Sequence, residues 1–159
     1  MLFRSGPIYL KGRDDTYNLR TPNQFVWENV GRTRADGPND YANMLAYWKG
    51  LIAFRMSDYG QVFRIAEPPP EGHYQWLLPI DEHLLGYVVA GRVLVLVNTG
   101  DFERAFNGVT LPAGRWRLIA NAQTVDHVAG VAGSDATLQG GTMYDLAVPP
   151  TSMKIWVRE

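Results

Sequence analysis

Two pairs of adjacent acidic residues are the first candidates for chemistry in this sequence. Hydrolysis of a glycosidic bond needs two carboxyl groups that face each other across the bond. Asp14 and Asp15 are neighbours in the chain, as are Asp81 and Glu82, and neighbouring side chains in an extended segment point to opposite sides. Neither pair could flank one bond, so we interpret all four as solvated turn acids. The sequence predicts no catalytic residue.

Histidines and serines offer no second route to catalysis. His73, His83 and His127 are far apart and lack the HxH or HExxH spacing that brings two imidazoles to one metal ion. No serine lies in the G-x-S-x-G context of a nucleophile elbow. The glycines of "GYVVAG" are wrongly arranged for a dinucleotide loop. We therefore predict neither a metal ion nor a cofactor.

Aromatic side chains are the remaining candidates for binding. Tyr74 and Trp76 are one residue apart after "PPPEG" and would share a face of an extended segment. An exposed pair of this kind can stack on sugar rings, with Trp116 behind it as a third member. Burial is the alternative that we favour for Tyr74 and Trp76, under a loop. Trp48, Trp116 and Trp156 lie within helix or strand patterns, which are typical of core residues.

The elements that must position these residues begin with a helix. "GPND" (37–40) supplies Asn39 or Asp40 as a cap for the first free N–H groups. Apolar residues then recur at steps of three and four, which predicts an amphipathic helix over about 40–56. Its predicted buried face contains Met44, Tyr47, Trp48, Leu51, Ile52 and Arg55.

Short β-prone runs make up the rest of the chain. "QVFRIA" (61–66) alternates, and the prolines of "EPPPEG" break the pattern. Seven further runs follow, separated by Gly, Pro, Asn or Asp: "HLLGYVVAG", "RVLVLVNTG", "VTLP", "RWRLIANA", "ATLQGG", "TMYDLAVPP" and "SMKIWVRE". This spacing predicts a mainly β chain with an antiparallel β-sandwich over 61–159 and a boundary near 57–61. "AGRVLVLVN" is apolar on both faces, which predicts a central strand.

Composition excludes several classes of function. The 159 residues carry a net charge of -1, which gives no electrostatic footprint for nucleic acid or for an anionic membrane. The absence of cysteine excludes disulfides and thiolate metal sites, and the longest apolar run is too short to span a bilayer. "MLFRSGPIYL" lacks the apolar region of a signal peptide, so the sequence leaves the location of the protein open.

Several segments, in order, resemble the end of alpha-amylase superfamily enzymes, closest to the type I pullulanases and related debranching enzymes. "YANMLAYWKGLIAFR" resembles their last barrel helix, where the sequence runs close to Tyr-Tyr-Lys-Gly-Leu-Ile-Ala-Leu-Arg. "GPIYLKG" resembles the eighth barrel strand, and "GRDDTYN" with "FVWEN" resembles the segment before the helix. "GYVVAGRVLVLVNTGD", "LPAGRWRLIANA" and "LAVPPTSMKIWVRE" resemble strands of the C-terminal sandwich.

This resemblance implies an organisation and a function. Residues 1–60 would be a remnant of the last β/α unit of a catalytic barrel, and 61–159 the C-terminal β-sandwich. The three catalytic acids of the family would lie upstream of this chain, and 159 residues cannot hold a barrel of about 250 residues besides a sandwich. We expect a non-catalytic domain that packs against and stabilises the catalytic barrel, in the same chain or as a separate polypeptide. The parent would be an extracellular alpha-glucan-acting glycosidase.

The resemblance also names residues near a substrate. "DDTYN" would lie on the loop after the last barrel strand, at the catalytic face. Asp14, Asp15, Tyr17 and Asn18 would therefore line outer glucose subsites in the parent enzyme, although "DDT" departs from the family's usual Asp-Asn-Ser.

Two other functions stay open. The chain could be a free-standing carbohydrate-binding module that holds an alpha-glucan on Tyr74, Trp76 and Trp116, or a structural domain without a ligand. Because an exposed apolar helix face is an association site, residues 1–56 could also pair between chains as a homodimer.

Overall fold

The computed structural model describes residues 27–37 and 40–159, and the chain divides into two compact units, Met1–Trp48 and Lys49–Glu159. In the described part of the first unit, two 3-10 turns, η2 (Trp27–Asn29) and η3 (Arg34–Asp36), precede the helix. The Asp36 carboxylate accepts a hydrogen bond of 2.9 Å from the backbone N–H of Thr33. This bond lowers the pKa of Asp36 and closes a reciprocal cap on η3.

One α-helix, α1 (Tyr41–Met56), runs through the division between the units. Its bounds match the predicted 40–56, and Asp40 caps it by accepting a 3.0 Å hydrogen bond from the Asn43 backbone N–H. At the other end, the Ser57 hydroxyl donates to the Phe54 carbonyl. Among the described helices, none is long and apolar enough to cross a bilayer.

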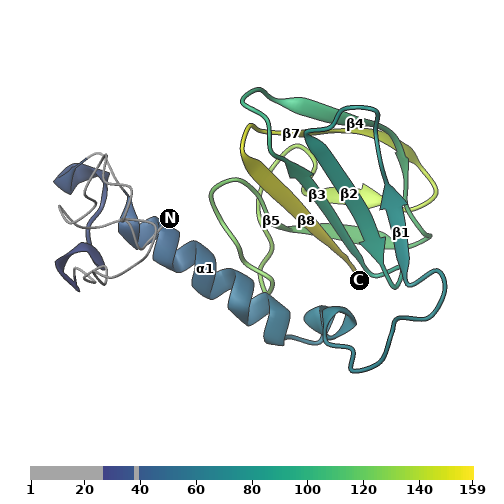
Figure 1. Cartoon of the computed structure of the whole chain (residues 1–159), viewed down its shortest axis with the longest axis horizontal. Coiled ribbons are helices and arrows are strands. Elements are labelled where there is room, and N and C mark those ends of the chain that lie inside the picture. The colour runs from purple at the N-terminus through teal and green to yellow at the C-terminus, as the bar shows by residue number, and fades with distance from the viewer. Residues whose placement is uncertain (1–26, 38–39) are drawn as a thin grey trace, which may run out of the picture. The chain divides into compact units, whose positions relative to one another are not determined.

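The second unit is built from β-strands (Figure 1). A 3-10 helix, η4 (Tyr59–Phe63), connects α1 to the first of them. The strands of the described residues are β1 (Tyr74–Leu77), β2 (Leu84–Val89), β3 (Val93–Asn98), β4 (Arg104–Thr110), β5 (Arg115–Ala120), β6 (Thr137–Gln139), β7 (Met143–Val148) and β8 (Ser152–Arg158).

These strands form two antiparallel sheets. The larger sheet has the order β1-β2-β3-β8-β5-β6, and the smaller sheet pairs β4 with β7. The predicted fold class is confirmed: a mainly β, antiparallel chain with one described α-helix. β3 is a central strand, as its uniformly apolar sequence predicted, and Val93–Leu96 are all buried.

The inner core lies between the two sheets. Alternate residues of the six-stranded sheet, including Leu94, Trp116 and Trp156, pack against Phe106 and Leu146 of the two-stranded sheet. The alternation follows the pleat, which sends successive side chains to opposite faces.

A second core covers part of the outer face of the six-stranded sheet. Leu51 and Phe54 from the last half of α1, together with Val62 of η4, pack against the other set of alternate residues, such as Val95 and Ile155. Gly50 lets the helix approach closely, because a Cβ atom there would lie 2.7 Å from the Cβ of Val125.

Two sequence predictions need correction. The buried face of α1 was placed wrongly in part: Trp48 and Ile52 are 51% and 60% exposed, while Phe54 is the residue that is buried. The run 61–66 contains the end of the 3-10 helix η4 and no strand. The compact unit that holds the sheets includes the last half of α1 from Lys49 onward, and Leu51 and Phe54 of this part belong to the second core.

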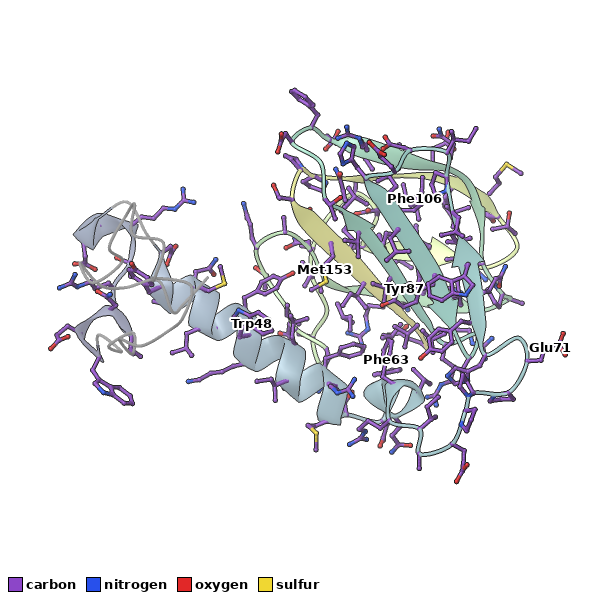
Figure 2. All side chains as sticks on the ribbon, viewed as in Figure 1. Trp48, Phe63, Glu71, Tyr87, Phe106 and Met153 are labelled. Atoms are coloured by element: carbon purple, nitrogen blue, oxygen red, sulfur yellow. The ribbon has the colours of Figure 1, made fainter. Side chains whose placement is uncertain are left out.

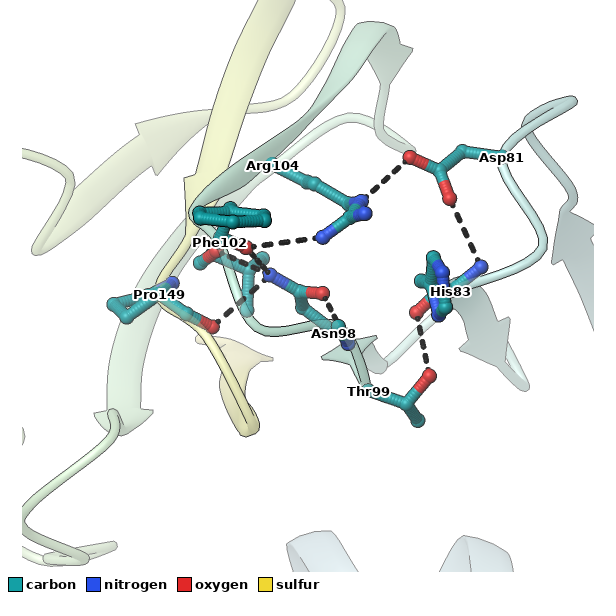
Figure 3. A network of polar contacts seen from close by, with 9 residues as sticks. Asp81, His83, Asn98, Thr99, Phe102, Arg104 and Pro149 are labelled. Carbon is teal, nitrogen blue, oxygen red and sulfur yellow. Dashed lines mark hydrogen bonds and ion pairs between the residues drawn. The ribbon is translucent and has the colours of Figure 1, made fainter.

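A buried amide closes one end of the inner core (Figure 3). Asn98 is fully buried at the end of β3. Its Nδ2 lies within hydrogen-bond distance of the carbonyl oxygens of Phe102, Val148 and Pro149, at 2.8, 3.0 and 3.2 Å. Its Oδ1 accepts from the Gly100 backbone N–H at 2.9 Å. One side chain thereby fixes the β3–β4 connection to the β7–β8 turn.

Candidate functional site

The predicted site residues fall in different parts of the chain. Asp14, Asp15, Tyr17 and Asn18 lie outside the described residues. Of the other acid pair, Asp81 has a structural role as a turn acid. Its carboxylate accepts hydrogen bonds from the His83 backbone N–H at 2.9 Å and from Nε of Arg104 at 2.7 Å, and these interactions lower the pKa of Asp81.

The candidate aromatic residues Trp116 and Trp76 differ in how far their side chains are buried. Trp116 is fully buried in the inner core, so it presents no ring face to a ligand, and the prediction that it adds to a binding surface is wrong. The strand pattern had indicated a core residue, which is what Trp116 is. Trp76 is 55% exposed, so the prediction of burial under a loop is wrong for this residue.

β1 and β2 place three aromatic rings together on the outer face. After a turn at Gly72, β1 pairs with β2 in a register that sets Trp76 opposite Tyr87 and Tyr74 opposite Val89. Leu77 of the same strand packs against the inner core, and the pleat therefore directs Tyr74 and Trp76 outward. Tyr87 projects from the same face of β2 (Figure 2). We call Tyr74, Trp76 and Tyr87 the aromatic triad.

The rings of the triad have a defined arrangement. Tyr74 and Trp76 stack, with ring centroids 5.7 Å apart and an interplanar angle of 21°. Tyr87 meets both edge-to-face, at 6.2 Å and 73° from Tyr74 and at 5.4 Å and 63° from Trp76. Such stacked and edge-to-face pairs are the favoured aromatic geometries. The triad is rigid on this account and because it stands on paired strands.

Contacts at the base hold the triad in place. His73, next to Tyr74, donates from Nε2 to the Val62 carbonyl oxygen at 3.0 Å, and its ring meets that of Tyr74 edge-to-face. Tyr87 is half-buried, and burial, with a smaller contribution from Tyr74, raises the pKa of its hydroxyl. The Tyr87 hydroxyl is therefore neutral near pH 7.

A second exposed feature runs along α1. Met44, Trp48, Ile52 and Met56 recur every four residues and are 37%, 51%, 60% and 64% exposed. Residues at this spacing form one row on a helix. Ile52 and Met56 lie on the side of α1 opposite to Leu51 and Phe54, given 3.6 residues per turn. We call these four residues the outer row; through its last two members, the part of α1 from Lys49 onward is apolar on two opposite sides.

Some ionisable residues elsewhere in the described part of the chain pair with one another at the sheet ends. No group of three or more His, Cys, Asp or Glu side chains there could hold a metal ion. Several acids form ion pairs at strand ends, such as Asp135 with Lys154 and Glu159 with Arg117, at 2.7 and 2.6 Å. These pairs connect strands and loops of the sandwich.

The sequence patterns did not predict the place of Tyr87 in the triad or the exposure of the outer row. Tyr87 lies in a run read only as strand, and its place in the triad depends on the β1–β2 register, which no local pattern contains. The alternation in "LLGYVV" could have placed it on the same face as Leu85. Met44, Trp48 and Ile52 were predicted on one buried face together with Leu51, whereas these three side chains are exposed; Met56 was not among the predicted residues.

Comparisons with known proteins add little. No protein-family model matches the sequence, and no curated protein matches it. Among solved structures, the chain is similar to a GH30 endoxylanase from Clostridium papyrosolvens C71, at 15% identity and a TM-score of 0.26. The match covers 58% of this chain and 22% of that chain, so it spans less than a quarter of the enzyme. The comparisons supply a distant glycoside hydrolase neighbour and assign no family.

Proposed function

We propose that this chain is the non-catalytic end of an alpha-glucan-acting glycoside hydrolase. In this proposal, α1 is the last helix of the catalytic barrel, and the β-sandwich packs against the barrel and stabilises it. The resemblance of "YANMLAYWKGLIAFR" and of the later strands to pullulanases motivates the proposal.

The observation that carries it is the apolar character of α1 on two opposite sides. One side is in the second core, through Leu51 and Phe54. The other side carries the outer row, whose residues Ile52 and Met56 are 60% and 64% exposed. A helix that is apolar all round normally lies between two layers, and an exposed apolar row is an association site. A catalytic barrel would provide the missing layer.

Binding to a barrel tests this proposal. The partner in the experiment is a type I pullulanase barrel that ends before its last helix, mixed with this chain and measured by calorimetry and by pullulan hydrolysis. We expect a complex that the double variant Ile52→Gln/Met56→Gln weakens by more than about tenfold, because each apolar side chain contributes about 1.5–3 kcal/mol when fully buried. Ala53→Gln is the matched control, since Ala53 is exposed on α1 outside the outer row.

Three results would contradict the proposal. The first is the absence of any complex, and the second is equal affinity of the double variant and the control. The third is release of reducing sugar from pullulan or starch by this chain alone. Light scattering on the free chain covers the homodimer alternative: a dimer that the double variant dissociates would assign the outer row to a second copy of the chain.

A further inference from the structure

We propose that the exposed face of Trp76 stacks on a pyranose ring of a neutral oligosaccharide. The site is the aromatic triad, in which Tyr74 supports the indole from behind and Tyr87 lies beside it. This inference does not depend on the proposed function, because it uses only the strands of the sandwich and would hold for a free-standing binding module.

The ring geometry leaves one indole face open. The three centroid distances within the triad are 5.7, 6.2 and 5.4 Å, so the centroids form a nearly equilateral triangle. Tyr87 therefore lies beside the Tyr74–Trp76 stack. If it lay on the far side of Trp76, its distance to Tyr74 would be close to the sum of the other two. Tyr74 stacks on the indole with its centroid 5.7 Å away, and Trp76 nevertheless remains 55% exposed, which leaves indole surface for a ligand.

The polar groups of the triad have no hydrogen-bond partner among the described residues. Each buried tryptophan of the inner core donates its Nε1–H to a backbone carbonyl: Trp116 to Pro112 at 2.9 Å and Trp156 to Asp135 at 2.8 Å. The Trp76 indole N–H and the hydroxyls of Tyr74 and Tyr87 form no hydrogen bond with any residue that the structure describes. An exposed indole in a cluster with three available donors suits a sugar, which offers axial C–H groups to an aromatic ring and hydroxyls to hydrogen-bonding groups.

The surroundings select a neutral ligand. Apart from the two tyrosines, every outer-face position of β1, β2 and β3 carries a side chain that does not ionise. These positions are Tyr74, Trp76, Leu85, Tyr87, Val89, Val93, Val95 and Val97. The phosphate of a nucleotide and the carboxylate of an acidic sugar would each need a positively charged side chain as a partner. None of these eight positions carries a lysine or an arginine. Base stacking alone therefore does not favour nucleic acid here.

The position on the sheet suits a chain longer than one sugar. β1 is an edge strand of the six-stranded sheet, so an oligosaccharide can stack one ring on Trp76 and continue past the edge. Stacking on one aromatic side chain contributes about 1–3 kcal/mol for nucleic-acid bases. We therefore expect a weak site with a dissociation constant in the millimolar range.

Two NMR readouts test the site on the full chain. Maltohexaose, cellohexaose and xylohexaose are titrated into ¹⁵N-labelled protein, and the indole N–H cross-peaks are followed. The peak that is missing in Trp76→Phe identifies Trp76. With at least one of the three sugars, we expect this peak to shift to saturation while the peak of Trp48, an exposed tryptophan outside the triad, stays in place. Saturation-transfer signals on the bound sugar provide the second readout.

Variants decide whether the triad is responsible. Trp76→Ala should abolish the saturation-transfer signal, Tyr87→Phe should weaken it, and Trp48→Ala should leave it unchanged. Far-UV circular dichroism and the melting temperature check that Trp76→Ala is folded. The inference is overturned if none of the three sugars moves the Trp76 peak, if Trp48 shifts equally, or if Trp76→Ala binds as before. It is also overturned if only the pullulanase barrel protein moves this peak, which would assign the face to a protein contact.

Discussion

The two faces of the six-stranded sheet are built from the same strands and are covered to different extents. The inner face is sealed by β4 and β7, and its tryptophans, Trp116 and Trp156, are fully buried with their N–H groups bonded to backbone carbonyls. The outer face is only partly covered, by α1 and η4. Its tryptophan, Trp76, is half exposed and has no hydrogen bond within the described residues.

This difference separates stability from recognition. A buried tryptophan with a bonded N–H contributes a large apolar area and leaves no polar group unsatisfied. An exposed one with a free N–H contributes little to folding and keeps its binding capacity for a partner. We expect substitutions on the inner face to change the free energy of unfolding, and substitutions on the outer face to change binding.

The largest expected effect comes from truncating one tryptophan on each face. Trp156→Ala should lower the free energy of unfolding by about 3–5 kcal/mol, because it leaves a large cavity in the inner core. Trp76→Ala should lower it by less than about 1 kcal/mol, since surface substitutions usually have small effects. Urea denaturation of both variants measures the difference. If both variants lose a similar amount of unfolding free energy, Trp76 contributes to stability as much as Trp156 does. The contrast between the two faces would then be wrong.

Asn98 tests how the inner face is closed at its end. Asn98→Ala removes the donor to three backbone carbonyls, and unsatisfied buried groups cost about 1–3 kcal/mol. Because several carbonyl groups lose their donor at once, we expect the free energy of unfolding to fall by about 2–3 kcal/mol. Asn107→Ala, at an exposed position of β4, is the control and should change stability by less than about 0.5 kcal/mol. Equal stability of the two variants would show that the network in Figure 3 is dispensable.

The inner face was more predictable from the sequence than the outer face. The local composition of runs such as "RVLVLVN" and "MKIWV" predicts strands. A position in the inner core can then be filled by any apolar side chain of suitable size. The position of Asn39 or Asp40 before an apolar period likewise predicted the start of α1. The surfaces of the outer face depend on two non-local facts: the β1–β2 register that sets Tyr87 beside Trp76, and the side of α1 that meets the sheet. Because α1 has apolar residues on two sides, its hydrophobic pattern does not indicate which of the two sides packs against the sheet.

A substitution at Gly50 tests how closely α1 packs against the outer face of the sandwich. In a free helix, Gly50→Ala would stabilise by about 1 kcal/mol through helix propensity. Here the new Cβ would lie 2.7 Å from both the Cβ and the carbonyl oxygen of Val125, and we expect a net loss of about 1–2 kcal/mol, typical of overpacking. Ala53→Gly, an exposed change one turn later, should cost about 1 kcal/mol through propensity alone. A higher melting temperature for Gly50→Ala would show that the helix is not seated against the loop at Val125.

The smallest expected effect is a pH dependence at the loop that carries Val125. The Asp126 carboxylate accepts hydrogen bonds from the backbone N–H groups of Ala129 and Val128, both at 2.9 Å, and these bonds lower the pKa of Asp126 below its ordinary value. A carboxyl group with a lowered pKa in the folded protein stabilises it above the unfolded-state pKa of about 3.9 and loses this contribution as the pH falls through the folded-state pKa. The free energy of unfolding of the wild type should therefore exceed that of Asp126→Asn at pH 7, and the gap should close below about pH 4. The same connection also carries Val131, which packs against the inner core, and Asp135, whose carbonyl oxygen accepts from the Trp156 indole. The fluorescence of Trp116 and Trp156 therefore reports whether the change at Asp126 spreads to the inner face, and we expect it to stay constant before global unfolding. If the fluorescence of Trp116 and Trp156 changes over the same pH range, the inner and outer faces respond as one unit. Stability and binding could then not be assigned to separate faces of the sheet.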